Sequence, residues 1–187
     1  DGATHLLVAD TAGTLHSVDA AAAGVSVMQT IDRTRSFHEV TLDGVSPIAS
    51  AEADAETLAF ARLLVAADTL GAAQAMIDKA VAYAKERQQF GRVIGSFQAV
   101  KHMCAEMAAK LEPSRALIWH AAHALDIGDS EGPMMANLAK AHLAEVGTFV
   151  ARTSTEVHGG MGFTDLVGLH YWYKRIGVNR QLLGSPE

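Results

Sequence analysis

The sequence is poor in cysteine, with Cys104 the only one among 187 residues. A single cysteine excludes a disulfide framework and a cysteine-based zinc site within this chain, and it is typical of a reducing compartment. The spacing of Cys104 places it on an apolar helix face. This position predicts a buried, unreactive thiol, because reactive thiols need an electropositive and accessible setting.

Basic residues and long apolar runs are scarce as well. Lys and Arg together number 15 against 21 Asp and Glu, for a formal net charge of -6, and they form no basic stripe of the kind that binds nucleic acid. No uncharged apolar run reaches the length of about 18 residues that spans a bilayer. The N-terminus lacks the charged and then apolar segments of a secretion signal. We therefore expect a cytoplasmic protein without a nucleic-acid partner or a membrane span.

What the sequence does contain changes character near residue 48. Before that point the short β-like runs THLLVA, GTLHSVD, GVSVMQ and SFHEVTL follow one another, at a spacing of roughly ten residues that predicts part of an antiparallel meander. The segment DGVSPIAS is then predicted to be an exit loop. Three or four short strands cannot close a barrel or a sandwich, so their edges need further chain or a neighbouring subunit.

From residue 49 onward Ala, Leu, Val and Met dominate with helical spacing. Four helices joined by short connections are predicted, at about residues 54–86, 97–127, 133–157 and 164–182. Pro113 should kink or restart the second helix, whereas Pro133 suits the first position of the third. The predicted fold is mainly α: an antiparallel four-helix bundle over residues 49–187, preceded over residues 1–48 by part of an antiparallel β-domain.

A metal centre is the first function to test in such a bundle. A carboxylate-bridged di-iron site requires two inward Glu-x-x-His pairs, and His142 and Glu145 stand in the reverse order. His120 and His123 lie one helical turn apart, but two ligands do not complete a site and no third is identifiable. We predict no bound metal.

The stretch KERQQFGRVIGSFQAV, residues 85–100, carries more than a turn between two helices needs. Arg87 offers a planar guanidinium suited to phosphate oxygens. Phe90 offers a flat apolar face for a ring system, and Gly91 and Gly95 permit close approach of the backbone to a ligand. The alternative for this stretch is a helical hairpin with a solvated arginine.

A second unusual turn is VHGGMGFTD, residues 157–165. Its adjacent glycines, Gly159 and Gly160, lie at a helix end, where they leave carbonyls free and permit close approach of a ligand. A double glycine is a weak signal by itself. The alternative is a helix C-cap followed by a tight turn.

Taken together, the two turns resemble the acyl-CoA dehydrogenase family in its C-terminal half. The family pattern is an Arg-x-x-Phe-Gly turn, a Phe-Gln pair opening the next helix, and a Gly-Gly-x-Gly turn before the last helices; all stand here in order. Residues 1–48 look like the end of the family's middle β-domain, and the remainder looks like its C-terminal helical domain. On this resemblance we expect a chain that lacks the family's N-terminal helical domain and the start of its β-domain.

The resemblance implies an FAD flavoprotein that oxidises the α,β-bond of an acyl-CoA thioester and passes the electrons to an electron-transfer flavoprotein. In such oligomers the arginine turn holds the pyrophosphate and adenosine of an FAD bound mainly by a neighbouring subunit. That role falls here to Arg87, Phe90, Gln98, Gly159 and Gly160. Glu156 departs from the pattern, since the family commonly has Gln there. A carboxylate beside a diphosphate costs Coulomb energy unless it is paired or protonated.

The chemistry of this family also needs a carboxylate base for the α-proton, with a pKa that approaches the operating pH. The family places this Glu at the position of Leu183, and another branch places it at Ala61; neither residue can accept a proton. Asp68 and Asp165 are other carboxylates, for which structural or solvated roles are the simpler interpretation. The resemblance places Arg62 near the thioester, with a snorkelling surface arginine as the alternative.

The loss of both base positions resembles one subset of the family. These are small bacterial subunits that assemble as heteromers, in which one chain supplies the base and the other only part of the FAD site. Steroid side-chain and other bulky CoA thioesters are associated with that subset. We therefore expect a subunit without its own catalytic Glu in a heteromeric dehydrogenase. The alternatives are a self-sufficient homomeric dehydrogenase with a relocated base, and a non-catalytic flavin-binding or scaffold bundle.

Overall fold

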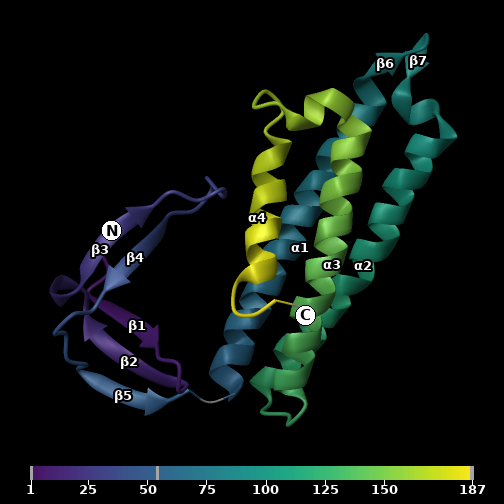
Figure 1. Ribbon diagram of the computed structural model, residues 1–187. Helices are drawn as coiled ribbons and strands as arrows, with labels where there is room; N and C mark the ends of the chain where they lie inside the picture. The colour runs from purple at the N-terminus through teal and green to yellow at the C-terminus, as the bar shows by residue number, and fades with distance from the viewer. Residues whose placement is uncertain (1, 54, 186–187) are drawn as a thin grey trace. The chain divides into compact units, whose positions relative to one another are not determined.

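The computed structural model describes residues 2–53 and 55–185. The chain forms two compact units, Asp1–Leu58 and Ala59–Glu187. The predicted fold class is confirmed, because the first unit holds small antiparallel sheets and the second a bundle of helices (Figure 1).

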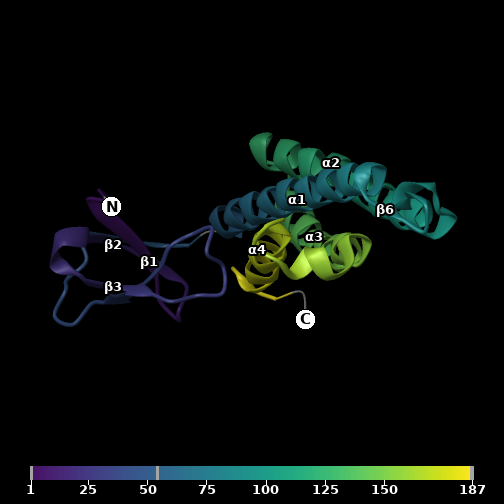
Figure 2. The ribbon, with the colours of Figure 1, turned by 90° about the horizontal axis from the view of Figure 1, so that it is seen from above.

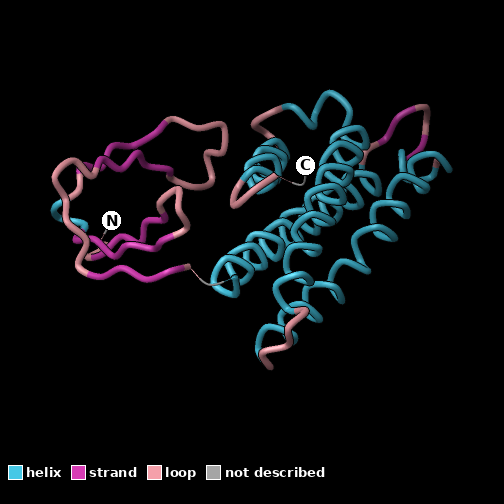
Figure 3. Tube along the Cα trace, turned by 60° about the horizontal axis from the view of Figure 1, so that its bottom comes forward, coloured by secondary structure: helices cyan, strands magenta, loops and turns pink. Residues whose placement is uncertain are grey.

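Strands of the first unit form two separate sheets rather than one meander (Figure 3). One sheet has the order β1-β2-β5, built from β1 (His5–Ala9), β2 (Thr14–Asp19) and β5 (Ala49–Glu52). The other pairs β3 (Gly24–Met28) with β4 (Phe37–Thr41). The four predicted strands are therefore confirmed as elements, but their arrangement differs from the prediction.

The predicted exit loop DGVSPIAS is a loop over residues 43–48, and only its last two residues belong to the unpredicted strand β5. Its residues pair with β2 in the register Thr14↔Glu52 to Ser17↔Ala49. The run ASAE has no alternation of large apolar and polar side chains, so the sequence gives no strand signal. The free edge of β2 supplies the reason for the strand, because its unpaired backbone groups gain hydrogen bonds from this segment.

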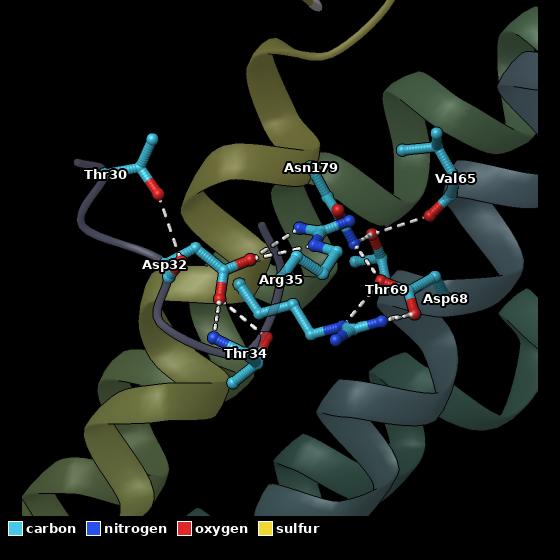
Figure 4. Close-up of polar contacts among 9 residues, drawn as sticks. Thr30, Asp32, Thr34, Arg35, Val65, Asp68, Thr69 and Asn179 are labelled. Carbon is cyan, nitrogen blue, oxygen red and sulfur yellow. Dashed lines mark hydrogen bonds and ion pairs between the residues drawn. The ribbon is translucent and has the colours of Figure 1, made fainter. Parts of the chain in front are cut away.

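A polar turn organises the connection between β3 and β4. The carboxylate of Asp32 accepts hydrogen bonds from the Thr34 amide at 2.9 Å, the Thr34 hydroxyl at 2.6 Å and Arg35 Nε at 2.9 Å (Figure 4). An Asp side chain that binds backbone two residues ahead is a common way to fix a turn.

The second unit is an antiparallel bundle of four helices (Figures 1 and 2). Its helices are α1 (Ala55–Glu86), α2 (Gln98–Asp126), α3 (Gly132–His158) and α4 (Leu169–Gln181). Between α1 and α2 lie the short strands β6 (Gln88–Gln89) and β7 (Arg92–Val93) and a 3-10 turn, η2 (Ile94–Ser96). A further 3-10 turn, η3 (Gly159–Phe163), follows α3.

The helix predictions need two adjustments. Of the two effects predicted for Pro113, a kink or a restart, the restart does not occur, because α2 continues through Pro113; core packing of neighbours such as Met107 and Leu111 overrides the local penalty of the proline. Helix α4 begins at Leu169 rather than near residue 164, because η3 and a left-handed Gly168 with φ 66° precede it. The prediction for Pro133 is confirmed, since it occupies the first turn of α3.

Small residues let α1 pack closely against its neighbours. Four alanines of α1 recur every seven residues and are at most 1% exposed: Ala59, Ala66, Ala73 and Ala80. On the facing side, a Cβ at Gly147 of α3 would lie only 2.7 Å from Thr69 Cγ2 of α1. The core of the bundle therefore depends on close backbone approach as much as on large side chains.

Helix α1 is the one helix among the described residues that is long and apolar enough to cross a membrane, a test that the core helices of soluble proteins also pass. Its alanines, together with Leu63, Met76 and Ile77, belong to the core of the bundle. This packing accounts for its apolar composition. The expectation of no membrane span stays a prediction.

Cys104 of α2 is partly buried and packs against the core. Burial raises the pKa of its thiol, which keeps the group protonated and weakly nucleophilic. The predicted burial is thus only partial, and the thiol has the chemistry expected of an unreactive group.

Candidate functional site

The turn after α1 is a tight β-hairpin that presents Phe90 to solvent. Strand pairing Gln89↔Arg92 leaves Phe90 and Gly91 as a two-residue loop, and both have positive φ, 51° and 75°. Such φ values at both loop positions are the type I′ pattern that suits Gly or Asn. A phenylalanine there costs roughly 1 kcal/mol of backbone strain, and its side chain is 91% exposed. A strained, exposed aromatic residue is a functional signal.

Ring contacts connect the hairpin to the start of α2. The rings of Phe90, in the hairpin loop, and Phe97, the N-cap of α2, meet edge to face with centroids 6.1 Å apart. The guanidinium carbon of Arg92 lies 3.9 Å from the Phe97 ring centroid, a cation–π contact. Gln98, the first residue of α2, approaches His102 with 3.5 Å between the two Nε2 atoms.

Arg87 is fixed through its backbone and keeps its guanidinium available. Its amide donates to the Tyr83 carbonyl at 2.8 Å, and its carbonyl accepts from the Ile94 amide at 2.8 Å. In the described part of the chain, the guanidinium has no hydrogen bond or ion pair. Gly95 has a packing role, because a Cβ there would lie 2.7 Å from the Ala84 carbonyl oxygen; its predicted approach to a ligand stays a prediction.

The two unusual turns of the sequence meet at one cavity of about 440 Å³. Its lining residues are Tyr83, Arg87, Gln89, Ile94, Glu156, Val157, His158, Gly159, Gly160 and Met161. Of the predicted cofactor residues, the structure thus brings together Arg87, Gly159 and Gly160. Phe90 and Gln98 are not among the lining residues of this cavity.

The glycine turn leaves open space beside its backbone. Gly159 has φ 58° and caps α3 by donating its amide to the Glu156 carbonyl. A Cβ added at Gly159 or at Gly160 would meet nothing within 4 Å, so packing does not require these glycines. The positive φ explains Gly159, whereas the predicted close approach of a ligand to Gly160 stays a prediction.

Two residues of the cavity were missed in the sequence. His158 is 4% exposed, its Nδ1 donates to the Ser154 carbonyl at 2.7 Å, and its ring stacks on Tyr83 with centroids 4.6 Å apart. Burial lowers the pKa of His158, so the imidazole is neutral near pH 7. A sequence signal was present, because Tyr83 lies one helical turn before Arg87.

Glu156 sets the negative side of the cavity. It lies in the last turn of α3, where the helix dipole is also negative. The same residue lines a neighbouring cavity of about 260 Å³ together with Arg152, Phe163 and Tyr173. The carboxylate that stands here in place of the family's Gln therefore lies at the cavity itself, where it would repel a bound diphosphate.

A second cavity of about 230 Å³ surrounds Arg62. Its lining residues are Arg62, Asn137, Lys140, Ala141, Leu183, Gly184 and Ser185. Arg62 donates from Nε to the Leu183 carbonyl and from Nη1 to Asn137 Oδ1, both at 2.9 Å. These directed contacts favour a fixed arginine at this cavity over the alternative of a snorkelling surface arginine.

The loop after α4 holds one of the two positions where the family has its base. Leu183 has φ 59°, unusual for a bulky residue, and Lys140 Nζ donates to the next carbonyl, that of Gly184. Two cations thus hold successive carbonyls of this loop. Lys140 was not among the predicted site residues, although a lysine within the apolar run NLAKAHLAEV is a visible signal.

The other candidate carboxylates have structural contacts. Asp68 receives hydrogen bonds from Arg175 Nη2 at 2.6 Å and Nε at 2.9 Å, and from Asn179 Nδ2 at 2.6 Å (Figure 4). Asp165 is exposed and accepts from the Tyr171 hydroxyl at 3.1 Å. Neither lines the cavities around Arg87 and Arg62. Within the described ranges, no three His, Cys, Asp or Glu side chains form a group that could hold a metal ion.

This chain is similar to a known family model and to several known proteins. A family model, acyl-CoA dehydrogenase C-terminal domain, matches residues 51–187. Acyl-CoA dehydrogenase IpdE2 of Mycobacterium tuberculosis is 36% identical over 160 residues, which cover 84% of this chain and 47% of that protein. The caffeyl-CoA reductase-Etf complex subunit CarC of Acetobacterium woodii is 39% identical over 108 residues, 58% of this chain and 28% of CarC.

Among solved structures, the Tcur3481-Tcur3483 steroid ACAD G363A variant superposes with a TM-score of 0.89 and 32% identity. The match covers 99% of this chain and 52% of that one. The chain therefore covers about half the length of IpdE2 and of the steroid ACAD chain, and a smaller share of CarC.

Proposed function

This chain belongs to the acyl-CoA dehydrogenase family, and from that premise we propose that it is a subunit of an FAD-dependent dehydrogenase acting on the α,β-bond of an acyl-CoA thioester. Its part is to hold one portion of the FAD rather than to supply the catalytic base. The observation that carries this proposal is that Arg87 and Gly160, from turns far apart in the sequence, line one cavity.

The residues of the cavity fit the diphosphate portion of FAD. The Arg87 guanidinium offers a planar donor edge for phosphate oxygens, and Gly159 and Gly160 leave room for close backbone approach. Phe90, exposed on the hairpin, is suited to stack on the adenine ring, and Gln98 begins the helix beside it. FAD, when bound, would supply the hydride acceptor of the reaction.

Glu156 is the residue that opposes this fit. Its carboxylate would lie near a diphosphate of the same sign, at a cost of about 1 kcal/mol for two charges 4 Å apart in water. Because Glu156 is exposed, solvent screens this repulsion. The cavity can therefore still bind the FAD diphosphate, but with a weaker affinity than if glutamine stood at position 156.

The loop at Leu183 supports a subunit without its own base. Arg62 donates a hydrogen bond to the backbone carbonyl of Leu183 and so holds the loop in place. The Leu183 side chain itself cannot take the substrate α-proton. The contacts of Asp68 and Asp165 give no support to a relocated base. The proposed role of Arg62 is to contact the acyl-CoA substrate through Nη2, because Nε and Nη1 hold Leu183 and Asn137.

We infer that the base comes from a second acyl-CoA dehydrogenase subunit of a heteromeric complex. Two relatives support this: the solved steroid ACAD carries two component names, Tcur3481 and Tcur3483, and CarC is a subunit of the caffeyl-CoA reductase-Etf complex. The steroid ACAD supports a bulky lipid or steroid thioester as the substrate. CarC supports an electron-transfer flavoprotein as the electron acceptor. The proposed location is the cytoplasm.

The test is coexpression with a second subunit that carries the missing Glu. We expect the protein to retain little flavin when expressed alone. With its partner it should purify yellow, and the flavin absorbance should bleach on addition of a suitable acyl-CoA. Bleaching by this protein alone would instead establish a self-sufficient homomer, and absence of flavin under both conditions would establish a non-catalytic bundle.

A further inference from the structure

Two cationic side chains, Arg62 of α1 and Lys140 of α3, share the cavity beside the loop after α4. None of the described residues that line this cavity is acidic, and neither cation has a carboxylate partner in the described part of the chain. Lys140 is only 6% exposed. A buried charge without an opposite charge is costly, so this pair of cations requires an explanation.

Hydrogen bonds inside the protein leave donors unused on both cations. The Lys140 ammonium has three N–H bonds, of which two point to the carbonyls of Arg180, at 3.4 Å, and Gly184. Arg62 uses Nε and Nη1 for Leu183 and Asn137, so its Nη2 remains. These carbonyls are neutral acceptors, which satisfy hydrogen-bonding groups without neutralising charge.

The charges around Lys140 also favour the binding of an anion. Its pKa is lowered by burial and by the neighbouring charges of Arg62 and Arg180. Arg180 pairs with Glu145, but no carboxylate is paired with Lys140 itself. An anion placed between Lys140 and Arg62 would gain attraction from both cations.

We propose that this cavity binds the carboxylate group of a small organic acid, one oxygen facing Lys140 Nζ and the other Arg62 Nη2. The amide nitrogen of Asn137 stands at the same cavity as a further donor, because its Oδ1 is already an acceptor from Arg62.

Size and lining select the class of ligand. The cavity of about 230 Å³ is smaller than a typical drug-sized site of about 300–1,000 Å³, and therefore suits an end group or a short acid. Ala141 and Leu183 add apolar surface beside the cations. A short hydrocarbon chain with one carboxylate uses both features, whereas inorganic phosphate uses only the charge.

Two molecules can carry this group. One is a free short-chain acid, and the other is an acyl-CoA whose acyl chain ends in a second carboxylate. The second source rests on the proposed function; binding of the free acid does not, since it needs neither flavin nor turnover.

Butyrate is the probe for the free acid, titrated into the isotopically labelled full chain at constant ionic strength. We expect saturable amide shifts at Asn137, Ala141, Gly184 and Ser185, with a dissociation constant in the millimolar range. Uncharged butyramide should produce none. Lys140→Met should weaken butyrate binding by about tenfold or more, the loss of one hydrogen bond to a charged group.

Further variants separate charge from folding. Lys140→Arg and Arg62→Gln test the site if Lys140→Met unfolds: the first should retain binding and the second should weaken it. Lys79→Met removes an exposed lysine elsewhere on the bundle and should change nothing. The proposal is overturned if butyramide or phosphate binds as well as butyrate, or if Lys140→Met and Lys79→Met behave alike.

A comparison of glutaryl-CoA with butyryl-CoA identifies the source. Tighter binding of glutaryl-CoA that disappears in Lys140→Met would assign the site to the thioester, and equal binding of the two thioesters would assign it to the free acid. Failure of flavin binding in the coexpression test would leave the butyrate result standing, so the two proposals fail separately.

Discussion

Arg62 and Leu183 are joined by a hydrogen bond of 2.9 Å from the guanidinium Nε to the backbone carbonyl. Because the acceptor belongs to the backbone, the contact does not depend on the side chain at residue 183. The Leu183 side chain is itself 40% exposed and adds little to the core. The shape of the loop is thus separable from the chemistry of this position.

Leu183→Glu should therefore leave the fold intact and change the charge of the cavity. We expect the free energy of unfolding to move by less than about 1 kcal/mol, because the substitution lies outside the core. The new carboxylate would lie near Arg62 and Lys140 and should abolish butyrate binding, measured by the same amide shifts. Leu183→Gln is the neutral control of equal size and should preserve binding; loss of binding in both variants would implicate loop distortion instead.

Arg87→Ala tests the proposed diphosphate contact. Removing a hydrogen bond to a charged group costs about 1.5–3 kcal/mol, so the affinity of the assembled oligomer for FAD should fall by about 10- to 100-fold. Flavin content and fluorescence titration measure this change. Arg115→Ala, which removes an arginine paired with Glu112 on α2, is the matched control. Equal flavin occupancy in the two variants would argue against the assignment of Arg87.

Glu156→Gln should strengthen flavin binding. The substitution removes a like charge beside the proposed diphosphate, and an exposed charge pair in water is worth about 1 kcal/mol or less, which corresponds to a gain of up to about fivefold. The gain should shrink at high salt, where the repulsion is screened. Glu131→Gln, at the other end of α3, serves as the comparison, and a weaker affinity for FAD in Glu156→Gln would show that the carboxylate makes a favourable contact.

Asp68→Ala should destabilise the bundle, because Arg175 and Asn179 of α4 both donate to this carboxylate of α1. We expect the free energy of unfolding to drop by about 2 kcal/mol, since polar groups around the site lose a charged acceptor. Urea unfolding measures the change. Asp165→Ala, on an exposed side chain, should stay within about 0.5 kcal/mol; similar losses in both variants would contradict a structural role for Asp68.

His158 should make stability depend on pH. Burial lowers the pKa of His158 in the folded protein, so the unfolded chain binds a proton more readily. Neutral His158 therefore makes its full contribution to the free energy of unfolding above about pH 6.5. This contribution is lost as the pH falls toward the lower pKa of the folded state. Urea unfolding of the wild type and His158→Gln at pH 7.5 and pH 5 should show a smaller difference at pH 5. A difference that is the same at both pH values would refute this prediction.

Much of the fold follows from local patterns. The three long helices begin and end within two residues of the predicted bounds, because apolar periodicity, glycine and proline are local signals. The start of α4 and the existence of β5 were not predictable in this way. A left-handed Gly168 delays the helix, and β5 exists because it pairs with β2 across a long stretch of sequence.

Some residues of the candidate sites were likewise predictable from the sequence, and others were not. Residue types and family resemblance selected Arg87, the double glycine and Arg62, and they showed that Leu183 cannot act as a base. They did not select His158 or Lys140. A buried polar residue within an apolar helix looks like core until the packing shows which backbone carbonyls it reaches.

The sequence by itself determined the four-helix bundle, the apolar residues Leu183 and Ala61 at the two positions where the resemblance predicts a base, and the double glycine, because each is a property of residue type and short-range spacing. Only the tertiary structure decided that Arg87 shares a cavity with Gly160, and that Arg62 and Lys140 hold adjacent carbonyls of one loop. Such meetings depend on how helices cross and where their ends lie, which is fixed by packing over the whole bundle rather than by any single segment.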